Sequence, residues 1–207
     1  RDLTIAPVKS GVLALSYYFA TFISTLLICL TATAICLLYL GKVGWYLTVG
    51  DVGLVLLDVV ILTLFGTALS SCVNFPLSTN GQGSAVGTII STGYGFICGA
   101  YMPISQFSKG LQRVISFLPG TYGTSLLRNH ALRGVFEEMG SKGFPDEVVD
   151  AIKDSVDCNL YFFGEKVAIS TMYTVLITSI LLLIGLYVII NILVEKAKKR
   201  KVKKSIL

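Results

Sequence analysis

Two long stretches of this sequence contain no charged residue, and they restrict the folds open to the chain. Gly11–Gly41 has none in 31 positions and Val167–Val194 has none in 28. About 20 consecutive apolar residues are enough for a helix to cross a bilayer. Only 14% of the residues are charged, whereas a soluble domain carries roughly 25%. The sequence therefore predicts an integral membrane protein and excludes a soluble globular one.

Four membrane-spanning helices are predicted from the apolar segments. They lie within Val12–Leu40, about Val52–Val73, about Ala85–Met102 and Val167–Val194, so that residues 11–102 hold the first three. The first is longer than a ~30 Å hydrocarbon core requires, and we expect it to tilt or to begin along the interface. The predicted fold class is an all-α integral membrane protein with four transmembrane helices.

The positive charge of the chain is concentrated at its carboxyl end. Residues 195–207 hold seven basic residues and one acid, so the rest of the chain, whose total is +5, sums to −1. Positive residues beside a span favour the cytoplasm. We therefore predict a basic cytoplasmic tail that contacts anionic lipid, and four crossings place the amino end in the cytoplasm as well. No aromatic residue interleaves the tail, which argues against nucleic-acid binding.

The region between the third and fourth spans is predicted to lie outside the cell. Its first part, residues 103–136, carries an apolar stripe on one helical face, formed by Leu111, Val114, Ile115 and Leu118. Apolar helices of this length are more often re-entrant than spanning, so we expect two re-entrant helices with a break at Pro119-Gly120. Residues 137–166 are polar in character, and we expect a small external helical region there.

Small residues recur in the third predicted span. Gly83, Gly87, Gly95 and Gly99 form two pairs with small-xxx-small spacing, which lets helix backbones approach closely in lipid. We expect Gly87, Gly95 and Gly99 to pack helices, either within one subunit or between two subunits.

Catalytic and metal-binding signatures are absent from the sequence. It has no GxxxxGK[ST] phosphate loop, no HExxH and no GxSxG motif. The only histidine, His130, is expected to be a polar residue at the membrane interface rather than a base or a ligand. The five cysteines show neither metal-binding spacing nor a disulfide framework. We expect no catalytic residue, no metal and no cofactor bound by this chain.

Asp58 is the one acid inside a predicted span, and ionisable groups at that depth are costly enough to suggest a function. One interpretation places it on a substrate or proton path. The other places it in a polar crevice near the headgroups, bonded to a neighbouring hydroxyl. The sequence leaves both open.

Three segments together resemble a known family, the membrane subunits of type-2 ABC exporters (ABC-2 permeases). The opening RDLTIAPVKSGVLALSYYFATFI is similar to the family's cytoplasmic coupling segment and the helix after it. GFICGAYMPISQF, at Gly95–Phe107, resembles the end of the family's fifth helix and the turn into its re-entrant helices. Pro119, Tyr122 and Arg128 keep a Pro-x2-Tyr-x5-Arg spacing similar to the family's carboxy-terminal signature.

The resemblance implies the last four of six spans of a permease that is a homodimer or heterodimer and pairs with a separate ABC ATPase subunit, which binds ATP and Mg. Residues 1–10 would be the coupling segment, with ATPase contacts through Asp2, Leu3, Thr4, Ile5, Ala6 and Pro7. Re-entrant helices at about Ile104–Leu118 and Tyr122–Phe136 would cap the exit. The substrate path or exit gate would comprise Asp58, Gly99, Tyr101, Pro103, Pro119, Tyr122 and Arg128.

The resemblance also implies export of a drug, antibiotic, peptide or lipid-linked glycan across a bacterial plasma membrane. A permease-like structural or sensory membrane protein is the alternative, because the basic tail and the small external region would suit that role. An ion-coupled secondary transporter ranks last, since it needs several intramembrane charges or internal repeats and only Asp58 is present.

Overall fold

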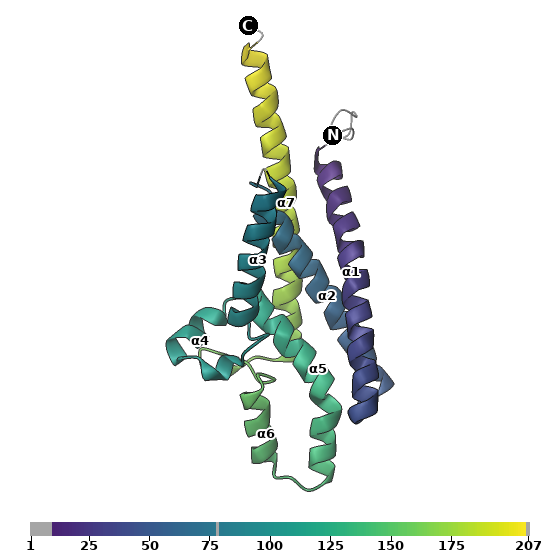
Figure 1. Ribbon diagram of the computed structural model, residues 1–207. Helices are drawn as coiled ribbons and strands as arrows, with labels where there is room; N and C mark the ends of the chain where they lie inside the picture. Colours follow the sequence, from purple (N-terminus) through teal and green to yellow (C-terminus); the bar gives the residue numbers. More distant parts are fainter. Residues whose placement is uncertain (1–9, 78, 206–207) are drawn as a thin grey trace.

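The computed structural model describes residues 10–77 and 79–205 and is built almost entirely of helices (Figure 1). Four helices run along its long axis: α1 (Ser10–Val43), α2 (Val49–Asn74), α3 (Asn80–Ile97) and α7 (Ile169–Ser205). The remaining elements, among them the 23-residue α5, lie between α3 and α7 in the sequence, towards one end of the molecule. The predicted coupling residues Asp2–Pro7 lie outside the described residues.

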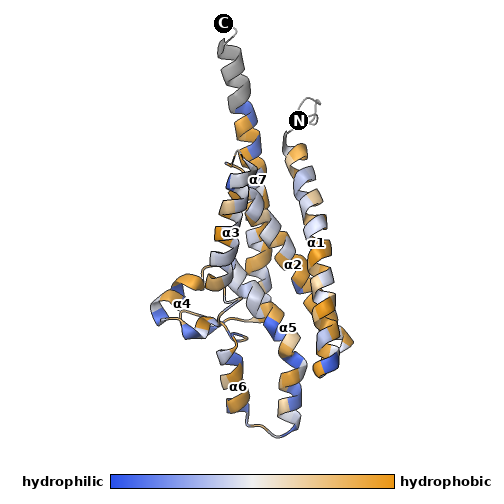
Figure 2. Ribbon diagram, in the orientation of Figure 1, coloured by the Kyte–Doolittle hydropathy of each residue, from blue (hydrophilic) through white to orange (hydrophobic). Residues whose placement is uncertain are grey.

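Three of the helices are long and apolar enough to cross a membrane, at Gly11–Val43, Val49–Asn74 and Ile169–Lys196. These candidate spans coincide with the first, second and fourth predicted spans. The start of α1 and the far end of α7 lie at the same end of the molecule (Figure 1). Apolar residues recur along all of α1 (Figure 2), including on its exposed sides, where Ile28 is 70% and Leu38 72% exposed. Exposed apolar side chains of this kind suit contact with lipid.

α3 has as many residues as the predicted third span, 18, but it begins and ends five residues earlier, and it is not among the helices that are long and apolar enough to cross a membrane. Its 18 residues end at Ile97 rather than at Met102, which corresponds to roughly 27 Å. Gly99 has a left-handed backbone (φ +81°), while the Gly99 and Ala100 amides donate to the carbonyls of Phe96 and Gly95. This hydrogen-bond pair is the Schellman arrangement that closes helices before a glycine.

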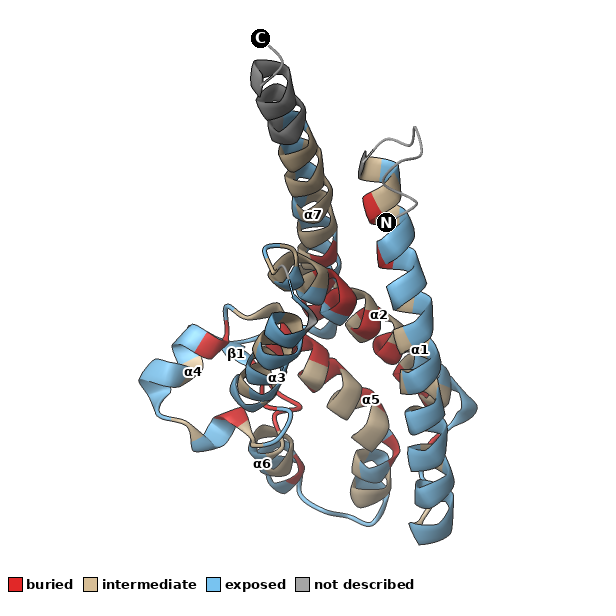
Figure 3. Ribbon diagram, turned by 45° about the horizontal axis from the view of Figure 1, so that its top comes forward, coloured by how far each residue is buried: buried red, intermediate tan, exposed pale blue. Residues whose placement is uncertain are grey.

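The centre of the molecule is where α2, α5 and α7 meet. The core joins the second half of α2 to the first turns of α5 and α7 through Ile61, Phe65, Tyr122, Leu126, Met172 and Leu176. Figure 3 shows the buried residues concentrated on α2 and α5, whereas α1 is largely exposed. α2 is thus the central helix of this chain, with protein on several sides.

The region predicted as two re-entrant helices has different bounds in the structure. Instead of one helix over Ile104–Leu118, a 3-10 turn (η2, Ile104–Gln106) precedes the seven-residue α4 (Lys109–Ile115). The second helix, α5, runs over Pro119–Ser141, beyond the predicted Tyr122–Phe136 at both ends. Pro119 occupies the first helical position, where the missing amide costs nothing, and its ring disfavours helical backbone at Leu118.

The predicted small external helical region contains one helix and a hairpin. α6 (Asp146–Ser155) follows Pro145, with Val149 buried. Two short antiparallel strands, β1 (Tyr161–Phe162) and β2 (Glu165–Lys166), pair just before α7. α7 then continues through the predicted basic tail as far as Ser205.

Candidate functional site

α5 carries the most extensively connected polar residues of the structure. It brings Pro119, Tyr122, Arg128 and His130 into one helix that packs against both α2 and α7. Three sets of contacts tie it to the rest of the chain, and each joins elements far apart in the sequence.

The first set is centred on Arg128, and we call it the Arg128 clamp: Gly99, Ile104, Arg128 and Asp157. Nη1 of Arg128 lies 3.0 Å from Oδ2 of Asp157, and Nη2 donates to the Gly99 carbonyl. Asp157 also accepts the Ile104 amide at 2.6 Å and the Ser105 amide at 3.1 Å. Charge-assisted hydrogen bonds of this type are stronger than neutral ones. The clamp therefore fastens the end of α3 to α5 and to the segment after α6.

The second set joins α3 to the start of α5. The Gly120 amide donates to the Tyr94 hydroxyl at 3.1 Å, and the Thr124 hydroxyl donates to the Cys98 carbonyl at 2.7 Å. A Cβ at Gly120 would lie 2.5 Å from the Tyr94 ring, so this close approach requires glycine. The Tyr122 hydroxyl donates to the Ser116 carbonyl at 2.5 Å. Pro119 and Tyr122 thus lie where α4, α3 and α5 meet.

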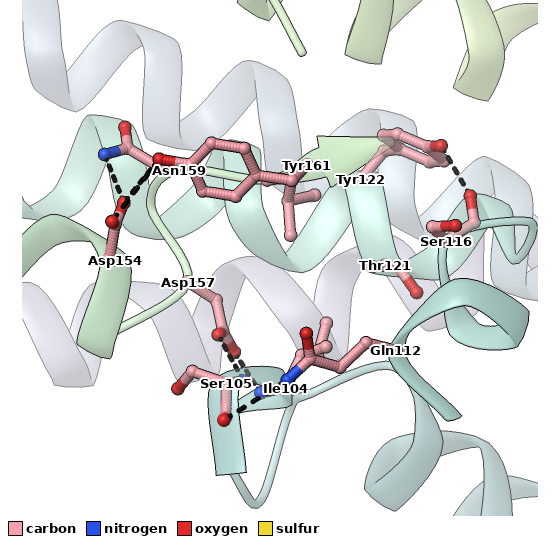
Figure 4. A pocket seen from close by; sticks show the side chains of 11 residues that line it. Ile104, Ser105, Gln112, Ser116, Thr121, Tyr122, Asp154, Asp157, Asn159 and Tyr161 are labelled. Carbon is pink, nitrogen blue, oxygen red and sulfur yellow. Dashed lines mark hydrogen bonds between the residues drawn. The ribbon is translucent and has the colours of Figure 1, made fainter. Parts of the chain in front are cut away.

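A polar cavity of about 220 Å³ lies beside the clamp, between the η2–α4 segment and the chain after α6. In Figure 4, Asn159 and Tyr161 lie next to Asp154, and Asp157 points to Ile104 and Ser105. Asp154 accepts hydrogen bonds from Asn159 at 2.7 Å and from Tyr161 at 3.1 Å. Gln112 donates to the carbonyls of Phe107 and Ser105. The bonds of Asp154 and of Gln112 stabilise the two walls separately, and Asp157 joins one wall to the other through the Ile104 and Ser105 amides.

The third set surrounds Asp58, where α2, α5 and α7 cross. Its Oδ2 lies 2.6 Å from Nδ1 of His130, and its Oδ1 accepts the Tyr173 hydroxyl at 2.6 Å. The side chains of Asp58 and His130 are 1% and 7% exposed. Tyr173 is a hydroxyl partner of the kind that the crevice interpretation required. That Asp58 also lines a substrate path stays a prediction.

The structure gives His130 a partner that the sequence analysis did not foresee. His130 is 6% exposed and lies within the protein, against Asp58, while its position at the membrane interface stays a prediction. The two residues are 72 positions apart, so no local pattern connects them. The contact could have been predicted only from chemistry, because a buried carboxylate needs a polar partner and the chain has a single histidine.

Asp51 is a buried acid that the sequence analysis missed. Its Oδ2 accepts the Thr48 amide and hydroxyl at 3.0 and 2.7 Å, forming a capping box at the start of α2. Its Oδ1 lies 3.5 Å from Nη1 of Arg133, outside hydrogen-bond geometry. Asp51 and Asp58 are seven residues apart, which places both on one helix face. On α5, Arg133 lies opposite Asp51 and His130 lies opposite Asp58. That spacing could have indicated the pairing.

The remaining predicted residues lie around the end of α3. Tyr101 is 67% exposed, and its ring packs on Phe96 and covers Gly95, where a Cβ would lie 2.5 Å away. Gly87 and Gly95 line an apolar cavity of about 280 Å³ between α2 and α3. No described atom beyond its own helix backbone and chain neighbours lies within 4 Å of a Cβ built at Gly87. Pro103 immediately precedes η2, next to the clamp.

Metal and cysteine chemistry find no support among the described residues. No group of three or more His, Cys, Asp or Glu side chains there is placed to hold a metal ion. All five cysteines are free. Burial raises the pKa of the Cys158 thiol to about 11, which keeps it protonated and unreactive at neutral pH.

The family comparison decides the class of protein. The model of the family described as "ABC-2 family transporter protein" matches residues 8–202, which include nearly all of the described helices. The chain belongs to this family. No curated protein and no solved structure matches it. As an ABC-2 family protein with three long apolar helices, it is a membrane-embedded, multi-pass transport protein.

Proposed function

We propose that the chain is the membrane-spanning permease subunit of an ATP-driven exporter, coupled to a separate ATPase that binds ATP and Mg. The observation that carries the proposal is the family match over residues 8–202. Its cargo would be a drug, an antibiotic, a peptide or a lipid-linked glycan. The subunit would work as a homodimer or heterodimer in the plasma membrane of a bacterium.

In this proposal α3 is the fourth crossing helix. Its 18 residues would span roughly 27 Å, close to the ~30 Å hydrocarbon core. Ile89 and Phe96 on α3 are 72% and 49% exposed, as suits contact with lipid or with a second permease. Four crossings put both ends of the chain in the cytoplasm, where the basic tail would contact anionic lipid and Asp2–Pro7 would contact the ATPase.

The Arg128 clamp suggests how α5 takes part in export. α5 packs on both α2 and α7 and holds the end of α3 through Arg128 and Gly99. A movement of α2 or α7 driven from the cytoplasmic end would shift α5. The clamp would then have to open or move as a unit for a cargo to leave. We assign the clamp, together with Pro119 and Tyr122, to the exit gate.

The coupling segment provides the test. The neighbouring genes are first searched for an ABC ATPase, the chain is co-expressed with it, and Asp2–Pro7 is replaced by a Gly/Ser linker. Because nucleotide-driven closure must pass through a rigid element, we expect cargo-stimulated ATP hydrolysis to fall to the basal rate while membrane insertion persists. A matched Gly/Ser replacement of residues 141–144, in the exposed turn between α5 and α6, should leave the stimulation intact.

Normal stimulation after replacement of Asp2–Pro7 would reject the coupling assignment. A histidine kinase in place of an ATPase beside the gene would instead favour the sensory alternative.

A further inference from the structure

Three phenylalanine rings form an exposed cluster beside the start of α7, and we call Phe117, Phe162 and Phe163 the aromatic tip. Their centroids lie 4.9–5.9 Å apart, and every pair packs edge to face. Phe117 is 62% and Phe163 64% exposed. The rings come from two elements, the end of α4 and the β1–β2 hairpin, so the fold assembles this apolar surface from separate segments.

The hairpin backbone holds the tip outward. Phe163 has a left-handed backbone (φ +51°) followed by Gly164 (φ +94°), and a bulky residue with positive φ is uncommon. The Phe163 ring packs only against the edges of Phe117 and Phe162 among the ring contacts described, and most of its surface stays exposed. Its apolar area is therefore available to a partner outside this chain.

An apolar face continues from the tip along α4. Leu111 and Val114 are 42% and 63% exposed and are spaced three residues apart, with Phe117 three residues further on. α4 stands out sideways from the helix body, near the level where α3 ends (Figure 1). Three basic residues, Lys109, Arg113 and Lys166, are exposed on α4 and β2. Rings with adjacent cations are typical of segments at the membrane interface.

A groove of about 520 Å³ joins the tip to the membrane-spanning helix. Phe117 and Phe162 line one end, Val167 lines it just before α7, and Thr171 and Val175 line it along the first two turns of α7. Glu165 and Lys166 border it on the hairpin side. Further along the same face of α7, Leu182 and Leu186, seven and eleven residues after Val175, are 69% and 47% exposed. The groove is thus continuous with the side of α7 that faces lipid.

We propose that the aromatic tip inserts into the leaflet at which α7 begins and that the groove holds an acyl chain of a phospholipid from this leaflet. Lys109, Arg113 and Lys166 then lie at the level of the lipid phosphates. The hairpin anchors the segment between α6 and α7, and through Asp157 it steadies the Arg128 clamp. This proposal requires only that α7 crosses a membrane, so it does not depend on the ATPase coupling.

Tryptophan fluorescence tests the insertion directly. The only tryptophan of the chain is Trp45, so Trp45→Phe gives a silent background into which Phe163→Trp is introduced. The protein is reconstituted in vesicles of phosphatidylcholine and phosphatidylglycerol that carry bromine near the top of the acyl chains. We expect the Phe163→Trp signal to lose most of its intensity to the brominated lipid and to resist acrylamide in water.

Phe144→Trp is the matched control, because Phe144 is 47% exposed in the turn between α5 and α6, away from the long helices. It should be quenched by acrylamide and not by brominated lipid. If Phe163→Trp disturbs the hairpin, the measurement is repeated with Phe117→Trp, which lies after α4 and outside the hairpin. Acrylamide quenching without lipid quenching at both tip positions would show a tip in water and overturn the proposal. Protection from both quenchers would show a protein partner, such as a second copy, and would overturn it too.

Discussion

α1 and α5 are held in the structure by opposite means. α1 is 34 residues long and leaves most of its large apolar side chains exposed, while the Tyr18 hydroxyl bonds the Leu64 carbonyl of α2 at 3.0 Å. α5 has 23 residues, and His130, Arg128 and Gly120 tie it to α2, to the segment after α6 and to α3. Both helices pack on α2 and α7, but α1 presents most of its large apolar side chains to its surroundings, whereas α5 is held by several polar contacts.

The difference indicates which parts of the molecule can move. A lipid-facing helix can slide or tilt at little cost, because one lipid contact replaces another. A helix fixed by buried hydrogen bonds has a few discrete positions, since each half-broken contact leaves a polar group unpaired. α5 is therefore the better candidate for a two-state element, and α1 for a passive one. Mutations on the two helices should differ accordingly.

The largest effect is expected from Asp58→Ala. The substitution leaves His130 and the Tyr173 hydroxyl without their partner, and each buried unpaired group costs about 1–3 kcal/mol. We expect the protein to lose about 2–4 kcal/mol of stability, measured as a fall in its unfolding temperature in detergent micelles. Asp58→Asn, which keeps the shape and one acceptor, should lose less and should insert normally.

Leu57→Ala is the control for this position, because Leu57 neighbours Asp58 on α2 but is 46% exposed. An effect of Leu57→Ala equal to that of Asp58→Ala would show that the polar contacts do not hold α5.

A smaller but sharper effect is expected from Gly134→Ala on α5. A Cβ at Gly134 would overlap the backbone carbonyl of Tyr46 in the turn between α1 and α2, and backbone cannot yield as a side chain can. Overpacking of this kind costs about 1–3 kcal/mol. Gly140→Ala, near the end of α5, meets no described neighbour within 4 Å and should be neutral or gain up to about 1 kcal/mol from helix propensity. The measurement is the unfolding temperature of the two variants, determined side by side. Equal unfolding temperatures would contradict the close contact of α5 with Tyr46.

The apolar helices could be predicted from the sequence because lipid imposes a simple rule on them. A span must satisfy its backbone internally and expose apolar side chains for its full length, and α1, α2 and α7 show that pattern in local sequence. The end of α3 was misplaced because Phe96 to Met102 is still fairly apolar. The left-handed backbone of Gly99 and the two Schellman hydrogen bonds at this position end the helix there despite the apolar composition.

The candidate site was predictable only in part, for a related reason. Arg128, Tyr122 and Pro119 were predicted from a spacing that resembles the family's signature, and their role in an exit gate stays a prediction. Asp157, which pairs with Arg128, lies 29 residues further on in a polar stretch with no motif. His130 and Tyr173 lie 72 and 115 residues from Asp58. Such pairs form because α5 turns back against α2, and that packing has no local signature in one sequence.

The smallest effects are expected on α1, where two substitutions separate lipid contact from protein contact. Tyr18→Phe removes the hydrogen bond to the Leu64 carbonyl and should cost about 1 kcal/mol. Ile28→Ala changes a side chain that is 70% exposed and should alter stability by less than about 0.5 kcal/mol. Both values come from unfolding in micelles. A larger loss for Ile28→Ala than for Tyr18→Phe would mean that the outer face of α1 packs against another protein chain, and α1 would then be positioned by specific contacts, as α5 is.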